Sequence, residues 1–181
     1  MILSMRDAHV VFARQARFRR HLRRLAPVLS RLRLEGRLEP NVLAILAVES
    51  FYRPGPLRLL EYVAWAVLSI LPARRGHVSV GMAQIRLHHL AQLGLIDSTR
   101  FSLARLNRIR GPEAAYEACS RYLSARDVLS EADPEALARA YAGGQRPHFA
   151  TLLAQARENQ SVEPPAIEPR TARPQPSVGA D

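Results

Sequence analysis

Glu49 is the residue of this chain best placed to do chemistry. Residues 40–52 have the spacing of a short helix, and positions i, i+3, i+4 and i+7 of one predicted face are Val42, Ile45, Leu46 and Glu49. A carboxyl group on such a face is withdrawn from water, and desolvation raises carboxyl pKa values, as a general acid needs at neutral pH. The same spacing allows an alternative, in which Glu49 is exposed or forms an ion pair with Arg53 one turn later.

Two later segments accompany Glu49 in an informative order. Glu49-Ser50-Phe51 is followed by Ser79-Val80-Gly81-Met82-Ala83-Gln84-Ile85 and then by Ala140-Tyr141-Ala142-Gly143-Gly144. Their order resembles the three signatures of the soluble lytic transglycosylases, which are Glu-Ser, Gly-Leu-Met-Gln and Ala-Tyr-Asn. Asn107, followed by Ala118-Cys119-Ser120-Arg121-Tyr122-Leu123, is similar to the helix that precedes the tyrosine signature of that family. The resemblance spans roughly residues 40–158.

This resemblance implies an all-α, lysozyme-like domain that cleaves bacterial peptidoglycan with a single acid. Glu49 would protonate the oxygen between N-acetylmuramic acid and N-acetylglucosamine, and would then act as the base while the muramic 6-hydroxyl closes a 1,6-anhydro ring. No second catalytic carboxylate is expected, unlike the usual glycosidase pair, and no metal or cofactor is expected. Tyr141 would orient the acid. The expected substrate-binding residues are Ser50, Ser79, Gly81, Met82, Gln84 and Tyr141.

The sequence also departs from the lytic pattern. Ala142 stands where the family has asparagine, Met82-Ala83 replaces Leu-Met, and the interval from Glu49 to Gly81 is longer than the family shows. A longer interval resembles the murein-polymerising glycosyltransferase domains of class A penicillin-binding proteins, which share the lysozyme-like core. Their pattern is loosely matched by Glu49, Phe51-Tyr52, Gly55, Ser79 and Gln84, although Ser50 replaces their aspartate and Ala83 their first glutamine. A polymerase and an inactive or repurposed relative are therefore the alternatives.

Positive charge is concentrated near the N-terminus. The chain has a formal net charge of +10 and no lysine, and its first 37 residues contain ten arginines against Asp7 and Glu35. Residues 6–34 are predicted to form a basic amphipathic helix, or a helix pair if Pro27 divides it. Its predicted apolar side carries Phe18, Leu22, Leu25, Leu29 and Leu32.

This basic region permits the interpretation of a non-catalytic binding protein for anionic polymers or membrane. A solvated face on a helix packed against the domain, or the arginine bias of a GC-rich genome, explains the same pattern. Nucleic acid is disfavoured as a partner, because no glycine-rich phosphate loop and no aromatic residues interleaved with the arginines accompany the charge.

Proline and glycine divide the chain into three regions: a basic helical extension at residues 1–38, the lysozyme-like domain at 39–159, and a proline-rich tail at 160–181 that is predicted to be disordered. No strand is expected. Residues 57–71 are the most apolar run but are too short to span a membrane, which predicts a buried core helix. The other predicted helices cover residues 83–93, 112–126, 134–142 after an Asp133 cap, and 147–158.

The remaining candidates have structural interpretations. Cys119 is the single cysteine, which excludes an internal disulfide and predicts a buried thiol. Glu61 is either a second carboxylate of the cleft or the ion-pair partner of Arg58. Trp65 is expected in the core, and the adjacent His88 and His89 point too far apart to share a metal ion.

The opening residues offer no apolar run of the length that a secretory signal needs. The protein is therefore expected to be cytoplasmic as made. Action on the cell envelope would need a non-standard export or release route.

Overall fold

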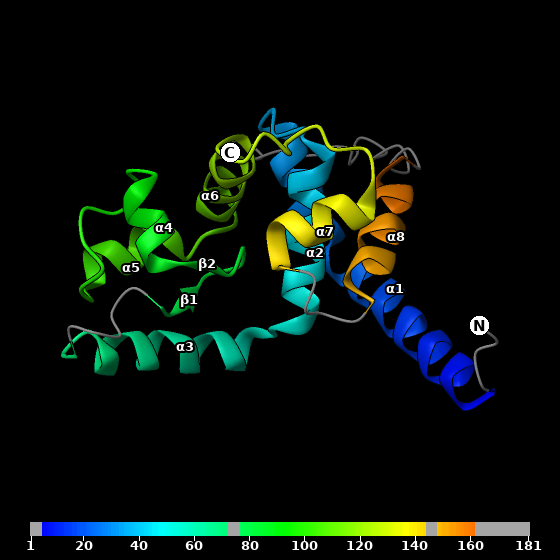
Figure 1. Cartoon of the computed structure of the whole chain (residues 1–181), viewed down its shortest axis with the longest axis horizontal. Helices are drawn as coiled ribbons and strands as arrows, with labels where there is room; N and C mark the ends of the chain where they lie inside the picture. The colour runs from blue at the N-terminus through cyan, green and yellow to red at the C-terminus, as the bar shows by residue number, and fades with distance from the viewer. Residues whose placement is uncertain (1–4, 72–76, 144–147, 162–181) are drawn as a thin grey trace, which may run out of the picture.

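The computed structural model describes residues 5–71, 77–143 and 148–161, and within them the fold is mostly helical (Figure 1). The elements are α1 (Met5–Leu34), α2 (Pro40–Tyr52), α3 (Gly55–Leu68), β1 (Ser79–Val80), β2 (Ile85–Arg86), α4 (Leu87–Gln92), α5 (Leu103–Ile109), α6 (Pro112–Ser124), α7 (Pro134–Ala142) and α8 (Phe149–Ser161). The predominance of helix in the prediction is confirmed, and the short hairpin of β1 and β2 is an addition to it.

Helix α2 forms the centre of the fold. The sequence predicted its bounds, but it predicted one apolar face, whereas every residue from Asn41 to Ser50 is buried. Helices α1, α6 and α8 pack around α2 (Figure 1), and its alanines allow them to approach closely. The Asn41 amide nitrogen donates to the carbonyls of Leu129 (2.8 Å) and Glu131 (2.9 Å), which ties the start of the helix to the segment between α6 and α7.

Helix α1 is continuous through Pro27, which confirms the single helix and excludes the alternative of a helix pair. Its predicted amphipathic character is confirmed, because Phe18, Leu22, Leu29 and Leu32 are buried and Leu25 packs against them. These side chains place α1 against α2, α6 and α8 rather than apart from the domain. Its exposed arginines include Arg17, Arg19, Arg20, Arg23 and Arg24.

The prediction of a buried core helix over residues 57–71 is wrong. Helix α3 extends along one edge of the molecule (Figure 1), and Trp65 is the residue of this helix that the structure buries. The indole Nε1 donates to the Thr99 carbonyl (2.8 Å), and the ring meets Phe101 edge-on with centroids 5.2 Å apart. Trp65 is thus a core residue, as predicted, and it attaches α3 to the segment before α5.

The segment after α3 forms a hairpin in which Ser79 pairs with Arg86 and Val80 with Ile85. The expected helix from residue 83 begins only at Leu87, because the turn between the strands needs left-handed backbone at Gly81 (φ +76°) and Gln84 (φ +54°). A Cβ atom at Gly81 would lie 3.1 Å from the Ile109 carbonyl oxygen, so glycine also allows the hairpin to approach α5. The short helix α5 was not predicted.

The predictions for the C-terminal helices agree well with the structure. The Asp133 carboxylate accepts from the backbone nitrogens of Glu135 and Ala136, both at 3.0 Å, and Gly143 ends α7 with φ +67°. Gly144, Pro147 and residues 162–181 of the tail lie outside the described residues. The tail was predicted to be disordered from residue 160, but Gln160 and Ser161 belong to α8. Among the described helices, none has the length and apolar character needed to cross a membrane.

Candidate active site

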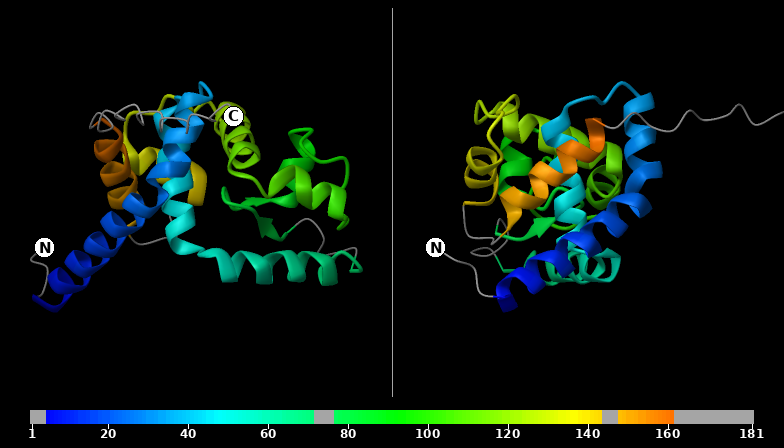
Figure 2. Two further views of the ribbon diagram at one scale, coloured as in Figure 1. Left: turned by 180° about the vertical axis from the view of Figure 1, so that it is seen from behind. Right: turned by 90° about the vertical axis from the view of Figure 1, so that its right-hand side faces the viewer.

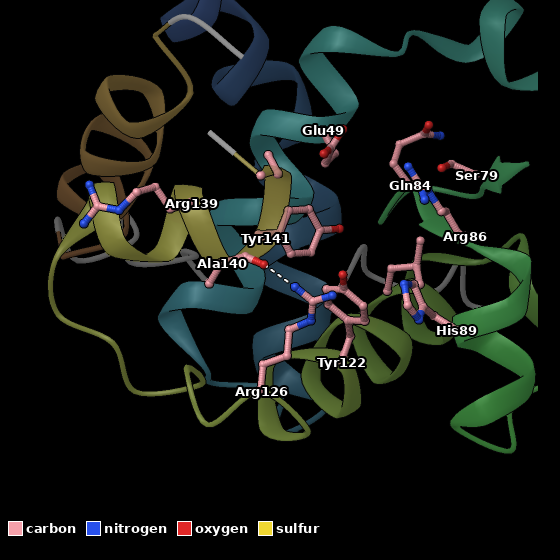
Figure 3. Close-up of a pocket in the computed structure, with 13 residues that line it drawn as sticks. Glu49, Ser79, Gln84, Arg86, His89, Tyr122, Arg126, Arg139, Ala140 and Tyr141 are labelled. Atoms are coloured by element: carbon pink, nitrogen blue, oxygen red, sulfur yellow. Dashed lines mark hydrogen bonds between the residues drawn. The ribbon is translucent and has the colours of Figure 1, made fainter. Parts of the chain in front are cut away.

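A groove of about 520 Å³ lies beside the C-terminal half of α2. Four of the seven residues that the sequence singled out line it, namely Glu49, Ser79, Gln84 and Tyr141. Figure 3 shows Glu49 and Tyr141 on one side of this groove and Ser79 and Gln84 on the other. These side chains come from α2, from the hairpin and from α7, so the fold brings together segments that are distant in the sequence.

Glu49 is buried to 1% exposure and yet lines the groove. The alternative in which its side chain is exposed is therefore wrong. Arg53, its proposed partner, forms an ion pair with Glu61 at 3.0 Å. Withdrawal from water disfavours the charged form of a carboxyl group, as the proposed acid role requires.

Cys119 of α6 lies close enough to Glu49 for the two groups to interact electrostatically. Burial raises the pKa of the Cys119 thiol far above its ordinary value, and Glu49 raises it further when its carboxyl group is ionised. The thiol therefore stays protonated and is a poor nucleophile. This agrees with the predicted structural role.

Gln84 is held rigidly at the opposite side of the groove. Its Nε2 donates to the Glu61 carboxylate (2.7 Å) and to the Gly81 carbonyl (2.9 Å), and Glu61 is held in turn by Arg53. Both amide hydrogens are used in this way, so the amide oxygen is the atom able to accept a hydrogen bond from a ligand hydroxyl. Glu61 is thus a positioning residue, and its predicted pairing with Arg58 is replaced by pairing with Arg53.

Tyr141 connects the two sides of the groove. Its hydroxyl donates to the Ala83 carbonyl in the hairpin turn, and its ring meets Tyr122 edge-on with centroids 5.6 Å apart. Ala142, which stands where the resembled family has asparagine, also lines the groove. The role of Tyr141 in orienting the acid stays a prediction.

Ser50 and Met82 do not line this groove. Both line a separate cavity of about 450 Å³ between α1, α2 and α3. The Ser50 hydroxyl donates to the Ala47 carbonyl (2.9 Å) and lies 2.7 Å from Nε2 of His21. Gly81 acts through its backbone: its left-handed conformation shapes the hairpin turn, and its carbonyl accepts the hydrogen bond from Gln84 Nε2. The substrate contacts predicted for these three residues remain untested.

One side of the groove is basic, and the sequence analysis did not predict it. Arg86, Arg126 and Arg139 line it together with His89 and Tyr122. Arg126 lies over the Tyr122 ring, 4.3 Å from its centroid. Burial lowers the pKa of His89, and the charges of His88, Arg126 and Arg86 also lower it, while the hydrogen bond with Gln92 opposes the shift. The net shift favours the neutral form of His89. The one available signal was Arg86, which follows the Gln84-Ile85 segment directly.

Comparison with known proteins gives no match for this chain, whether with family models, with curated proteins or with solved structures. Among the residues that the structure describes, no group of three or more histidine, cysteine, aspartate and glutamate side chains is arranged to hold a metal ion. The function of this protein is therefore inferred from the geometry of the groove.

Proposed function

We propose that this protein is a lysozyme-like enzyme of the lytic transglycosylase type, which cleaves peptidoglycan glycan strands with Glu49 as its acid and base. The observation that carries the proposal is that the buried Glu49 shares one groove with Ser79, Gln84 and Tyr141. A buried carboxyl group opposite fixed hydrogen-bonding groups fits a reaction that needs one acid and an oriented sugar.

The reaction would have two steps at Glu49. In the first, the protonated carboxyl group gives its proton to the glycosidic oxygen as the bond from that oxygen to the anomeric carbon of the muramic residue breaks. In the second, the muramic 6-hydroxyl bonds to the same carbon and returns its proton to the Glu49 carboxylate. The acid is regenerated, and one chain end becomes a 1,6-anhydro sugar without consumption of water.

The charge of the groove supports an anionic glycan as substrate. Peptidoglycan carries carboxylates on its lactyl groups and stem peptides, and guanidinium groups bind carboxylates strongly. Arg86, Arg126 and Arg139 line the groove, so they are placed to contact these groups, whereas a neutral chitin strand offers them no charge.

Incubation of the purified protein with murein sacculi tests the proposal. Mass spectrometry of the released fragments is expected to show muropeptides that end in 1,6-anhydro-muramic acid. Fragments that end in reducing muramic acid would indicate hydrolysis by water instead, and release of no fragments by the folded protein would defeat the lytic proposal.

A murein-polymerising activity is the second candidate. It is favoured by the long interval between Glu49 and the hairpin, in which the structure places α3, a helix of 14 residues. The sequence pattern of the murein-polymerising domains also has a long interval at this point. Conversion of a lipid-linked disaccharide precursor into long glycan, together with intact sacculi, would assign the polymerising direction.

Arg86→Gln is expected to weaken substrate binding without removing catalysis. Arg86 is exposed at the end of the hairpin and lines the groove, so its loss removes a charge-assisted contact while Glu49 stays in place. We expect KM for peptide-bearing strands to rise about tenfold with little change in kcat. Arg100→Gln, which removes an exposed arginine outside the groove, is the control. An equal loss in both variants would contradict a specific role for Arg86.

A further inference from the structure

A second cavity lies on the side of α2 away from the groove. This basic cavity of about 450 Å³ lies between α1, α2 and α3, and no described residue lines both the cavity and the groove. Figure 2 shows α1 crossing α2 near the corner where the chain turns from α2 into α3, while α7, which borders the groove, lies on the other side of α2. Small-ligand sites have volumes of roughly 300–1,000 Å³. The basic cavity is therefore large enough to hold a small molecule of its own.

Three guanidinium groups line the basic cavity. Arg24 of α1 and Arg110 at the end of α5 are exposed, whereas Arg58 of α3 is partly buried. Within the described part of the chain, none of the three forms an ion pair. No aspartate or glutamate is among the described residues that line the cavity. The cavity thus carries an excess of positive charge, and guanidinium groups bind phosphates and carboxylates strongly.

Arg58 is the residue of this cavity that gains most from a bound anion. Its Nε donates to the Arg53 carbonyl (2.9 Å), which fixes the side chain and leaves the two Nη groups as donors. Withdrawal from water lowers the pKa of this guanidinium group, and interactions with Tyr62, Glu61 and Glu49 oppose the shift only in part. Holding a charge in such a position costs free energy, and an anion in the cavity would recover part of that cost.

Two helices begin at the basic cavity. Gly55 opens α3 and Pro112 opens α6, and both residues line the cavity. The N-cap residue of each helix is proline or glycine, which has no side chain to accept hydrogen bonds from the first turn. Glu113 in the first turn of α6 is engaged by Arg31 at 3.1 Å. The partial positive charges of the two helix ends therefore add to the charge of the arginines.

Most of the remaining lining is apolar. The polar exceptions are His21 and Ser50, whose Nε2 and hydroxyl oxygen lie 2.7 Å apart. The apolar lining residues include Leu25, Val28, Phe51 and Met82. A ligand that combines an anionic group with an apolar group thus matches both parts of the cavity.

We propose that the basic cavity binds a phosphate monoester that carries an apolar group. The phosphate contacts Arg24, Arg58 and Arg110, and the apolar group packs against the apolar lining. A phosphate monoester carries about two negative charges at pH 7, so it balances three fixed positive charges better than a carboxylate does. The proposal is independent of glycan cleavage, because neither Glu49 nor Gln84 lines this cavity.

Calorimetric titration of the full chain with octyl phosphate, at concentrations below those that form micelles, tests this proposal. We expect octyl phosphate to bind at least about tenfold more tightly than inorganic phosphate, octanol or octanoate, because only octyl phosphate offers both the apolar group and the double charge. Affinity for octyl phosphate that is matched by inorganic phosphate or octanol would overturn the proposal. Octanoate bound equally well would overturn the assignment to a phosphate monoester.

A pair of double variants places the ligand in the cavity. Arg24→Gln combined with Arg110→Gln changes two exposed side chains and should weaken octyl phosphate binding by about tenfold or more. The matched control is Arg100→Gln combined with Arg108→Gln, which removes the same charge from exposed positions outside the cavity and the groove. Equal losses in the two double variants would show attraction to net charge alone and would overturn the site. Cleavage of murein sacculi should be the same in wild type and in the Arg24 and Arg110 variant, so this proposal and the enzymatic one can fail separately.

The source of the phosphate monoester is decided by flotation with vesicles of phosphatidylcholine and phosphatidic acid. Binding of octyl phosphate without flotation assigns a soluble ligand. Flotation that is lost in the Arg24 and Arg110 variant, but kept in the Arg100 and Arg108 variant, assigns the lipid phosphate.

Discussion

Glu49→Gln will lower the rate of glycan cleavage by about a thousandfold, within the range that a general acid contributes. Glutamine has nearly the same size and can still occupy the buried position at the end of α2, but its amide cannot give a proton to the glycosidic oxygen. The same side chain would serve as the base in the second step, so both steps lose their proton carrier. Initial rates on sacculi, measured by release of anhydro-muropeptides, provide the value.

Substrate binding should survive this substitution. The groove, the Gln84 amide and the basic side do not depend on the charge of Glu49, so affinity for a soluble peptide-bearing glycan, measured by calorimetry, is expected to change less than about threefold. Glu117→Gln is the matched control, because the Glu117 side chain is 43% exposed in its ion pair with Arg121 on α6 and does not line the groove. Wild-type cleavage by Glu49→Gln would remove Glu49 from the mechanism.

Trp65→Ala is expected to reduce the free energy of unfolding by about 3–5 kcal/mol. The indole is fully buried, packs on Phe101 and donates to the Thr99 carbonyl, so truncation leaves a large cavity and a carbonyl without its donor. Urea unfolding followed by circular dichroism measures the difference.

The matched control is Leu60→Ala on the same helix. Leu60 is 62% exposed, so its truncation should change the free energy of unfolding by less than about 0.5 kcal/mol. Equal stability of the two variants would contradict the attachment of α3 through Trp65. Loss of that attachment should also impair cleavage, because α3 carries the Glu61 carboxylate that holds Gln84.

The sequence predicted the elements whose limits are set by local signals. Helix α2 begins at Pro40, and α7 lies between the Asp133 cap and the left-handed Gly143, because these residues act on the backbone next to them. The exposure of most of α3 could not be predicted in this way. Its leucines and valines favour burial in general, but composition does not reveal that no described element covers their face.

The candidate site was predictable only in part. The order of short segments identified Glu49, Gln84 and Tyr141, whereas Ser50 is adjacent to Glu49 on a helix and is therefore rotated by about 100° toward the other cavity. Spacing along α3 favoured a pair between Glu61 and Arg58. In the structure, Arg58 instead donates to the Arg53 carbonyl (2.9 Å), and the Arg53 side chain takes Glu61.

The basic side of the groove depends on tertiary structure in the same way. Arg86, Arg126 and Arg139 belong to β2, to the turn after α6 and to α7, and nothing in the sequence between them indicates that they meet. Their proximity follows from the packing of the hairpin and α7 on either side of the groove.

A crystal structure of Glu49→Gln with a peptide-bearing glycan tetrasaccharide tests whether position 49 meets the glycosidic bond in this groove. We expect the sugar to lie in the groove between the hairpin and α7. A glycosidic oxygen should lie within hydrogen-bonding distance of the amide at position 49, and a sugar hydroxyl should donate to the Gln84 amide oxygen. A glycan bound away from this groove, or in the groove with every glycosidic oxygen beyond reach of position 49, would contradict this expectation.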